Sequence, residues 1–200
     1  MIGIIDYNLG NIASVANALC RVGHSVMIVT KPEQLSGCSH AVLPGVGAFQ
    51  TGMRNLEDLG FIDSITKYIE SGKPFLGICL GMQLLFNSSE EAEPDCRGLG
   101  LVNGTVRSFE SKVGNYIPHV GWNDVTTQDE SRSLLNSGES FYFVHSYYCI
   151  CSDKRDIDAK SFYGIDFDVS IRKENVFGVQ FHPEKSHKPG LEFLKKFGDL

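Results

Sequence analysis

The feature that most constrains the fold of this chain is the alternation of strand-like and helix-like segments along its first ninety residues. Four short apolar runs predict buried strands, at residues 2–5, 26–29, 41–43 and 74–78. Parallel strands need long crossover connections, which are usually helices that cover both faces of the sheet. The sequence therefore predicts an α/β fold, with a mostly parallel central sheet and helices on both of its faces.

The segments between these strands carry apolar residues at helical spacing. They predict a helix over 12–19 that ends by Gly23, a second over 61–69 that ends at Ser71-Gly72, and a third over 80–86. Each follows or precedes a predicted strand, as a parallel sheet requires. The first half of the chain thus reads as a run of strand–helix units.

Beyond Gly98 the pattern changes to strand-like segments with few helices between them, at residues 101–109, 117–125, 141–151, 162–172 and 176–181. They are expected either to extend the sheet with antiparallel strands or to form a small second sheet. A closing helix is predicted over 188–197. With no repeat or linker to divide the chain, one domain is expected over residues 1–200.

Charge and leader signals narrow the class of protein. The 24 acidic residues outnumber the 18 basic ones, for a net charge of −6, so neither nucleic acid nor an anionic membrane is expected as a partner. No basic leader precedes the first strand, and a cytoplasmic location with reduced cysteines is expected. The pair Cys149-x-Cys151 lacks a second pair at zinc spacing, so no metal or cofactor is predicted.

The stretch Gly77-Ile-Cys79-Leu-Gly81 has the pattern of a nucleophile elbow with cysteine in place of serine. A strand is predicted to enter it and a helix to leave it. The flanking glycines would relieve crowding around a strained central residue. The helix N-terminus would favour thiolate over thiol, and the Leu80 N–H would point toward an oxyanion. Cys79 is therefore the predicted nucleophile, against the alternative of a packed core cysteine.

A thiolate that forms an acyl-enzyme needs a base, and the base needs a group to orient it. Gln180-Phe-His182-Pro-Glu184 supplies both directly after a predicted strand. His182 is the predicted base and Glu184 its orienting carboxylate. The alternative is a surface histidine beside a surface glutamate, which the elbow cysteine disfavours.

Pro44-Gly-Val-Gly47 follows the third strand and is expected at the same sheet edge as Cys79, where its backbone could offer a second oxyanion donor or form only a tight turn. His145 is a rival base, but a histidine in an aromatic strand is more often a packed, hydrogen-bonded residue. Trp122 is expected in the core rather than as a substrate platform.

The stretches Gly77–Gln83 and Phe181–Glu184 resemble the class I (triad-type) glutamine amidotransferases, over nearly the whole chain. The resemblance implies their flavodoxin-like architecture. Within that family, four further stretches are most similar to the glutaminase subunits of imidazole glycerol phosphate synthase in histidine biosynthesis: Asp6-Tyr-Asn-Leu-Gly-Asn11, Pro44-Gly-Val-Gly-Ala-Phe49, Pro118-His-Val-Gly-Trp-Asn123 and Phe143-Val-His-Ser-Tyr147. Val46 and Met82 depart from the anthranilate and aminodeoxychorismate synthase subunits.

The resemblance implies a glutaminase reaction. Cys79 would attack the side-chain amide of glutamine, and His182, oriented by Glu184, would protonate the departing ammonia before water hydrolyses the thioester. Oxyanion donors are implied at Leu80, Val46 and Gly47. Contacts to the amino-acid end of glutamine are implied at Gln83, Glu91, Ser146 and Tyr147, with Glu90 as the alternative carboxylate.

The resemblance also implies a partner that uses the ammonia. In this family that partner is a (β/α)₈-barrel cyclase, which needs about 250 residues of its own. A heterodimer is therefore expected, with the barrel over the Cys79 face. Its interface candidates are Asn8, Asn11, Pro118, Trp122 and Asn123, together with Lys185 as a gate or an ion-pair contact.

Three functions remain open from the sequence. The first is the histidine-pathway glutaminase, and the second is a paralogue that supplies ammonia to an amidino-sugar synthetase. The third is an elbow-cysteine hydrolase or protein-quality-control domain of similar topology, which needs no ammonia acceptor. The late His182-Pro-Glu184 motif and the context of Gln83 disfavour the third.

Overall fold

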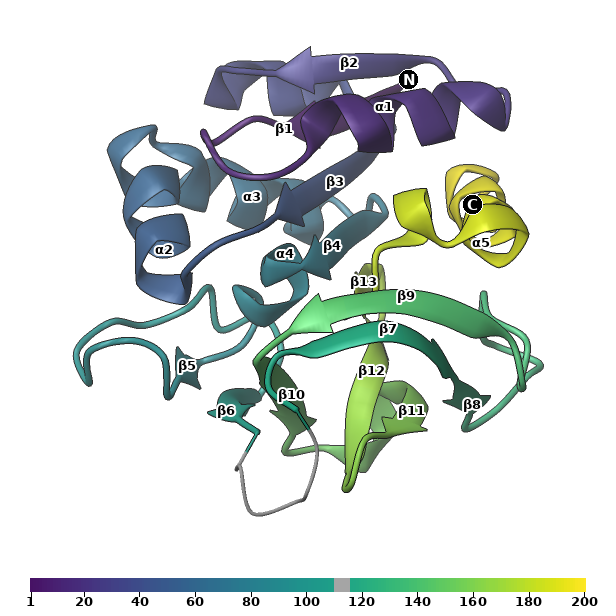
Figure 1. Ribbon diagram of the computed structural model, residues 1–200. Helices are drawn as coiled ribbons and strands as arrows, with labels where there is room; N and C mark the ends of the chain where they lie inside the picture. The colour runs from purple at the N-terminus through teal and green to yellow at the C-terminus, as the bar shows by residue number, and fades with distance from the viewer. Residues whose placement is uncertain (110–115) are drawn as a thin grey trace.

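The computed structural model describes residues 1–109 and 116–200. Its first part alternates strands and helices (Figure 1): β1 (Ile2–Ile5), α1 (Ile12–Arg21), β2 (Val26–Val29), the 3₁₀ helix η1 (Pro32–Gly37), β3 (His40–Gly45), α2 (Phe49–Asp58), α3 (Phe61–Glu70), β4 (Phe75–Cys79) and α4 (Leu80–Gln83). Strands β2, β1, β3 and β4 pair in that order, all parallel. The predicted parallel sheet is confirmed.

The second part is mostly strands: β5 (Ser88–Ser89), β6 (Gly104–Ser108), β7 (His119–Asp124), β8 (Thr126–Thr127), β9 (Ser140–His145), β10 (Tyr147–Cys151), β11 (Ile157–Phe162), β12 (Asp166–Lys173) and β13 (Val176–Val179), with 3₁₀ turns at η3 (Lys154–Asp156) and η4 (Pro183–Lys185), and helix α5 (His187–Gly198). Strand β13 is parallel to β4, and β12 then continues the sheet antiparallel. Strands β7 and β9 form a separate two-stranded sheet. Both expected arrangements of the later strands therefore occur together.

The segment 141–151 is not one strand, as the sequence predicted, but two strands in different sheets. It divides at Ser146, whose carbonyl accepts a hydrogen bond from the Phe109 N–H at 3.1 Å. Before Ser146 the chain pairs with β7, and after it with β6 and β12. The predicted strand 162–172 likewise contains the end of β11, a turn and most of β12.

Helix α4 is shorter than the predicted 80–86, because the chain turns after Gln83. The carbonyl groups of Leu84, Leu85 and Phe86 would accept intrahelical bonds if the helix continued. They instead accept hydrogen bonds from N–H groups of residues 99–102. A distant loop thus replaces the partners that further helical turns would supply.

Helix α2 was not predicted, and its start explains why. Ala48 stands at the N-cap and offers no side-chain acceptor. The carboxylate of Glu91 accepts the Phe49 N–H at 2.8 Å instead, from 42 residues along the chain. An interior Gly52 weakens the local helix signal further. The helix depends on a tertiary contact that no local pattern contains.

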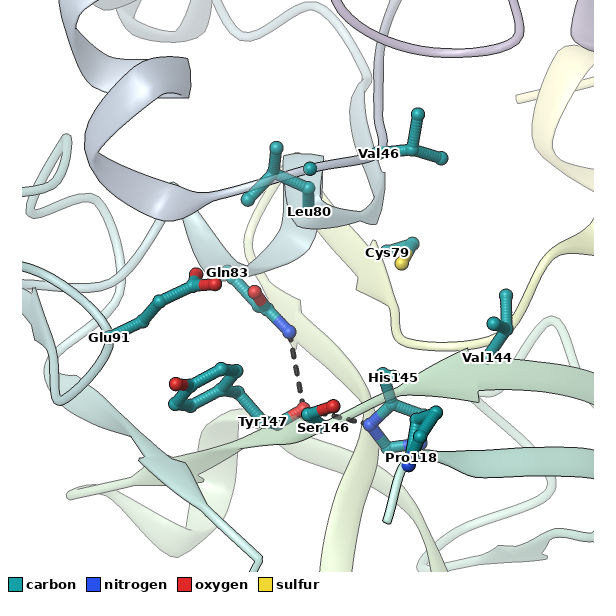
Figure 2. Close-up of a pocket in the computed structure, with 11 residues that line it drawn as sticks. Val46, Cys79, Leu80, Gln83, Glu91, Pro118, Val144, His145, Ser146 and Tyr147 are labelled. Atoms are coloured by element: carbon teal, nitrogen blue, oxygen red, sulfur yellow. Dashed lines mark hydrogen bonds between the residues drawn. The ribbon is translucent and has the colours of Figure 1, made fainter.

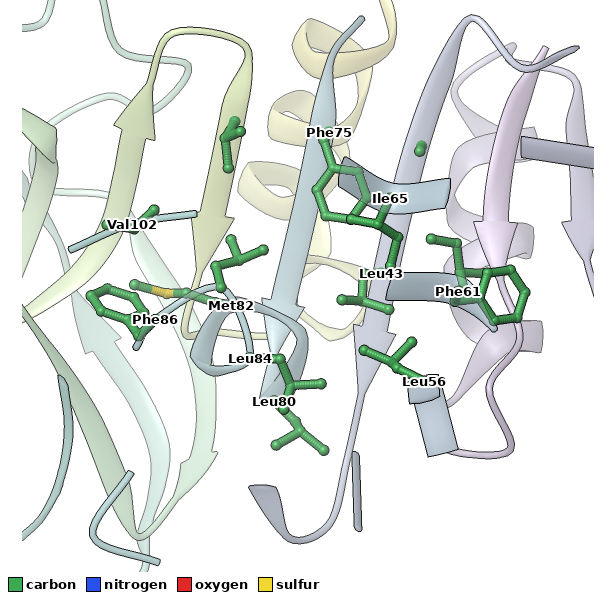
Figure 3. Close-up of a cluster of buried hydrophobic side chains, with 14 of the residues drawn as sticks. Leu43, Leu56, Phe61, Ile65, Phe75, Leu80, Met82, Leu84, Phe86 and Val102 are labelled. Carbon is green, nitrogen blue, oxygen red and sulfur yellow. The ribbon is translucent and has the colours of Figure 1, made fainter. Parts of the chain in front are cut away.

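Two apolar clusters cover the two faces of the large sheet. One contains buried residues of α2 and α3, such as Leu56, Phe61 and Ile65, packed near Phe75 (Figure 3). The other contains buried residues of α1 and α5 together with the aromatic residues of β9. Helices therefore lie on both faces, as predicted. Among the described residues, no helix combines the length and the hydropathy needed to cross a bilayer.

Candidate active site

Cys79 ends strand β4 in a strained turn, with φ at +53° and ψ at −110°. Helix α4 begins at the next residue. A Cβ on Gly77 would lie 2.6 Å from the carbonyl oxygen of Gly81, and one on Gly81 would overlap the carbonyl of Leu43. Both glycines are therefore required for the close approach of helix and strand. The predicted elbow is present.

Strand β13 brings the predicted base beside this elbow. It pairs in parallel with β4, with Val179 opposite Ile78, so that both strands end at the same sheet edge. Beyond that end, His182 Nδ1 contacts Glu184 Oε1 at 2.8 Å, and both side chains are about 97% buried (3% and 2% exposed). The sequence prediction that Glu184 turns back onto the imidazole agrees with this contact.

The surroundings of His182 favour its protonated form. Burial acts to lower the pKa of the imidazole, but its interactions with Cys79 and with the Glu184 carboxylate outweigh burial and raise that pKa well above the usual value. The other ring nitrogen, Nε2, is buried, and no described residue forms a hydrogen bond with it. A buried thiol and imidazole in this arrangement can form a thiolate–imidazolium pair.

Ser186 fastens His182 to the small sheet. Its hydroxyl donates to the His182 carbonyl at 2.6 Å and accepts from the Tyr142 N–H at 2.9 Å. The His182 N–H in turn donates to the Tyr142 carbonyl at 2.9 Å. Strand β9 therefore holds the backbone of His182 from both sides, and Ser186 itself is fully buried.

A cavity of about 320 Å³ opens in front of Cys79 (Figure 2). Every residue that the sequence assigned to the oxyanion or to glutamine lines it: Leu80, Val46, Gly47, Gln83, Glu91, Ser146 and Tyr147. Pro118, Val144 and His145 complete the lining and were not assigned to the cavity beforehand. His182 and Glu184 are not part of this lining. Glu184 instead lines a second pocket, together with residues of α1 and α5.

The side chain of Gln83 can offer this cavity only an acceptor. Its Nε2 donates to the Tyr147 carbonyl at 3.2 Å (Figure 2). It also donates to Gln180 Oε1 at 3.1 Å, so both of its N–H bonds are used. The Tyr147 carbonyl contacts both Gln83 Nε2 at 3.2 Å and His145 Nδ1 at 2.7 Å, so both of its lone pairs are used. The Ser146 carbonyl accepts the Phe109 N–H at 3.1 Å and keeps one lone pair. A ligand contact from Tyr147 therefore falls to its N–H group or its side chain.

The two candidate carboxylates occupy different places. Glu91 lines the cavity on the same side as Gln83 (Figure 2), and one of its oxygens caps helix α2. Glu90 instead accepts the Ser108 N–H and pairs with Arg107 at 3.8 Å, with half of its side chain exposed. The geometry favours Glu91 over Glu90 as the carboxylate at the cavity.

Gln180 is a buried polar residue at this site that the sequence reasoning quoted without a role. Its Nε2 lies 3.7 Å from Cys79 Sγ, and its side chain is fully buried. The signal that could have found it is a polar amide in an otherwise apolar strand. Such a residue is rarely buried without a specific partner.

His145 and His119 form a second buried pair at the far side of the cavity. His119 Nδ1 and His145 Nε2 are 2.9 Å apart, and His145 Nδ1 lies 2.7 Å from the Tyr147 carbonyl. Burial lowers the pKa of His119 to about 4 and that of His145 to about 3, so both are neutral near pH 7. The expectation of a packed, hydrogen-bonded His145 agrees with these contacts.

The interface candidates differ in how exposed they are. Trp122 is 48% exposed and stacks on His187, so the prediction that it packs in the core is wrong. Along β7 the exposed residues alternate, at Val120, Trp122 and Asp124, so the indole lies on the outward face of the small sheet. Lys185, Asn8 and Pro118 are exposed as well.

Two other candidates have partners within the chain. Asn11 caps helix α1 by accepting the Ser14 N–H at 3.2 Å. Asn123 donates to the Phe162 carbonyl at 2.9 Å and contacts His119. Their side chains therefore support local structure, whatever else they contact.

The chain is similar to known proteins along nearly its whole length. The family described as glutamine amidotransferase class-I matches residues 3–199. Imidazole glycerol phosphate synthase subunit HisH 2 of Methanococcus maripaludis is 44% identical, over 98% of each chain. The subunit HisH of Caldanaerobacter subterraneus is 46% identical, over 100% of this chain and 98% of its own.

Two solved structures share the fold at low sequence identity. One is a glutamine amidotransferase, with a TM-score of 0.75 at 22% identity, which covers 100% of this chain and 99% of its own. The other is PurLQS from Thermotoga maritima, with a TM-score of 0.75 at 20% identity over 99% of this chain and 95% of its own. Both likenesses extend along nearly the whole chain.

Proposed function

The chain belongs to the class-I glutamine amidotransferase family, and we propose that it is the glutaminase subunit of an imidazole glycerol phosphate synthase. It acts in histidine biosynthesis, as one domain over residues 1–200. The observation that carries the proposal is the meeting of Cys79, His182 and Glu184 at one sheet edge, in a chain that is full-length similar to synthase subunits named HisH.

The first chemical step is attack by the Cys79 thiolate on the carboxamide carbon of glutamine. The resulting oxyanion is stabilised by the backbone N–H of Leu80 and by the Val46–Gly47 segment, which line the same cavity. Protonated His182 gives its proton to the departing nitrogen, which leaves as ammonia. The C–N bond breaks and a thioester to Cys79 remains.

The second step restores the enzyme. Neutral His182 accepts a proton from water, whose oxygen attacks the thioester carbon, and glutamate leaves as the Cys79 thiolate and the imidazolium form again. The Glu184 carboxylate, 2.8 Å from Nδ1, keeps the ring oriented through both steps and stabilises its charged form. Glutamine and water are thus converted to glutamate and ammonia.

The remaining polar groups of the cavity fit the amino-acid end of glutamine. Gln83 has only its Oε1 to offer, and Glu91 offers a carboxylate, so both suit the ammonium group rather than the carboxylate of the substrate. Tyr147 contributes its N–H group or side chain, because its carbonyl already has two partners, and Ser146 can contribute its N–H group and its hydroxyl. The substrate carboxylate would lie toward those donors.

The ammonia acceptor is a cyclase subunit with a (β/α)₈ barrel, which docks over the cavity to form a heterodimer. Two exposed residues of the cavity lining, Val46 and Pro118, support this position. Trp122 and Lys185 are exposed as well, and both lie near the ring of Tyr142, at 6.1 and 5.9 Å. Lys185 would act as an ion-pair contact or gate. An amidino-sugar synthetase is the alternative acceptor.

The test is to mix the chain with a cyclase subunit and its ribonucleotide substrate and to measure glutamate release. The parent chain should be stimulated by the bound partner, whereas C79A should release no glutamate. K185A should retain basal hydrolysis and lose stimulation. If C79A retains activity, the assignment of Cys79 as the nucleophile is wrong. If only an amidino-sugar synthetase stimulates the chain, that enzyme is the ammonia acceptor instead of the cyclase.

A further inference from the structure

Gln180 lies between the proposed nucleophile and the proposed substrate-binding amide, and no step of the reaction above uses it. Its side chain is completely buried. One end, Nε2, is 3.7 Å from Cys79 Sγ, and the other end, Oε1, is 3.1 Å from Gln83 Nε2. Gln83 in turn reaches the Tyr147 carbonyl at 3.2 Å. A hydrogen-bonded relay therefore joins strand β10 to the sulfur.

The direction of this relay is fixed at its far end. A backbone carbonyl can only accept, so Gln83 must present its NH₂ group to Tyr147. The same NH₂ group then donates to Gln180, which must present its carbonyl oxygen in return. The Gln180 NH₂ group is left for Cys79. The opposite amide orientation would set two NH₂ groups against each other inside a buried site, at a high energetic cost.

A donor directed at sulfur distinguishes the two forms of the thiol. An N–H group stabilises a thiolate, and hydrogen bonds to charged groups are the stronger class. We propose that Gln180 is a positioning residue that holds the Cys79 sulfur in place and in its ionised form, through a relay anchored at the Tyr147 carbonyl. The proposal rests on the proposed function only in taking Cys79 as the nucleophile.

The role complements that of His182. The imidazole supplies the proton that the leaving group needs, whereas the Gln180 amide has no proton to exchange and acts on the sulfur alone. The amide also couples the sulfur to Gln83, so that the residue that meets the substrate and the residue that attacks it share one rigid connection. Loss of Gln180 should therefore change the reactivity of the sulfur without removing the catalytic acid.

The test measures the pH dependence of Cys79 alkylation by iodoacetamide, with modification at that residue resolved by mass spectrometry. In Q180M, which keeps the length of the side chain, the pH of half-maximal alkylation rate should rise by about one unit. Q180E should raise it further, because a carboxylate places negative charge beside the sulfur. The matched control is N175L, just before the start of β13. It removes a side-chain amide that donates two hydrogen bonds, to the Ile69 and Lys73 carbonyls.

An unchanged midpoint in folded Q180M would overturn the proposal, as would an equal shift in N175L. If Q180M does not fold, Q83L breaks the relay one link away and should shift the midpoint in the same direction by a smaller amount; no shift there counts against the proposal. The measurement needs no turnover. A glutaminase-inactive C79A together with an unshifted Q180M would therefore leave the proposed function standing and remove this inference alone.

Discussion

His182, His119 and His145 are buried to similar extents, between 2% and 6% exposed. Their surroundings nevertheless shift the pKa of His182 and those of the other two in opposite directions. His182 faces a carboxylate and a thiol, and its pKa is raised. His119 and His145 face each other, aromatic rings and a carbonyl, and their pKa values fall to about 4 and about 3.

The proposed catalytic histidine and the packed pair differ in the charge of their partners. Burial alone disfavours the imidazolium, and only an anionic partner reverses the effect. The partner of His182 is Glu184, two residues along, at the edge of the parallel sheet. In the small antiparallel sheet no described carboxylate contacts His145, which makes that histidine a structural link to Tyr147.

Loss of the His182 imidazole should have the largest effect of these substitutions. H182Q removes the acid for the departing ammonia and should lower kcat of glutamine hydrolysis by about a thousandfold, with the substrate KM little changed. The matched substitution H145Q should keep kcat within about tenfold and cost about 1–3 kcal/mol of unfolding free energy. Glutamate release by the reconstituted complex measures both.

If H145Q is folded and as inactive as H182Q, the assignment of His182 as the base is wrong. Urea unfolding of both variants supplies the control for folding, because the loss in H145Q is expected in stability rather than in turnover.

The second effect is acid sensitivity of the small sheet. Because His119 and His145 have lowered pKa values in the folded chain, the unfolded chain binds more protons below about pH 6.5, and stability falls as the pH falls from there toward about 4. The loss should be about 4–5 kcal/mol between pH 7 and pH 4.5 in urea unfolding, roughly half from each histidine. H119Q should flatten this dependence by about half.

The control for this measurement is H187Q, which replaces an exposed histidine at the start of α5. It should leave the pH dependence of stability as it is in the parent. If H119Q and H187Q behave alike, the acid sensitivity does not arise in the small sheet.

Loss of the Glu184 charge should have a more modest effect, on stability. A raised pKa of His182 in the folded chain adds stability that is fully present below about pH 6.5 and is lost as the pH rises through the raised value. E184Q removes one cause of that rise. Its deficit in unfolding free energy should be about 1–2 kcal/mol near pH 6.5 and shrink toward alkaline pH. A deficit that instead grows with pH would contradict the assignment of Glu184 as a charge partner.

Much of the catalytic edge was predictable because its signals are local. The elbow needs glycines at fixed offsets around Cys79, and the His182–Glu184 contact spans two residues. Strand and helix periodicity identified β1, β2, β3 and β4 and the helices α1, α3 and α5. In each case the physical constraint acts within one turn or one strand, where a sequence pattern can express it.

The tertiary structure decided what depends on distant partners. Helix α2 has the Glu91 carboxylate as its cap, and α4 stops at Gln83 where residues 99–102 bind the carbonyl groups of residues 84–86. The segment 141–151 divides at Ser146, whose carbonyl accepts the Phe109 N–H. The relay from Tyr147 through Gln83 and Gln180 to Cys79 joins three strands and a helix whose positions are set by sheet pairing. The sequence alone predicts Cys79 as the nucleophile and His182 as its base, because the elbow glycines and Glu184 lie within two residues of them. The contact of Gln180 with Cys79 depends on tertiary packing, because a hydrogen bond between residues about a hundred positions apart produces no local sequence pattern.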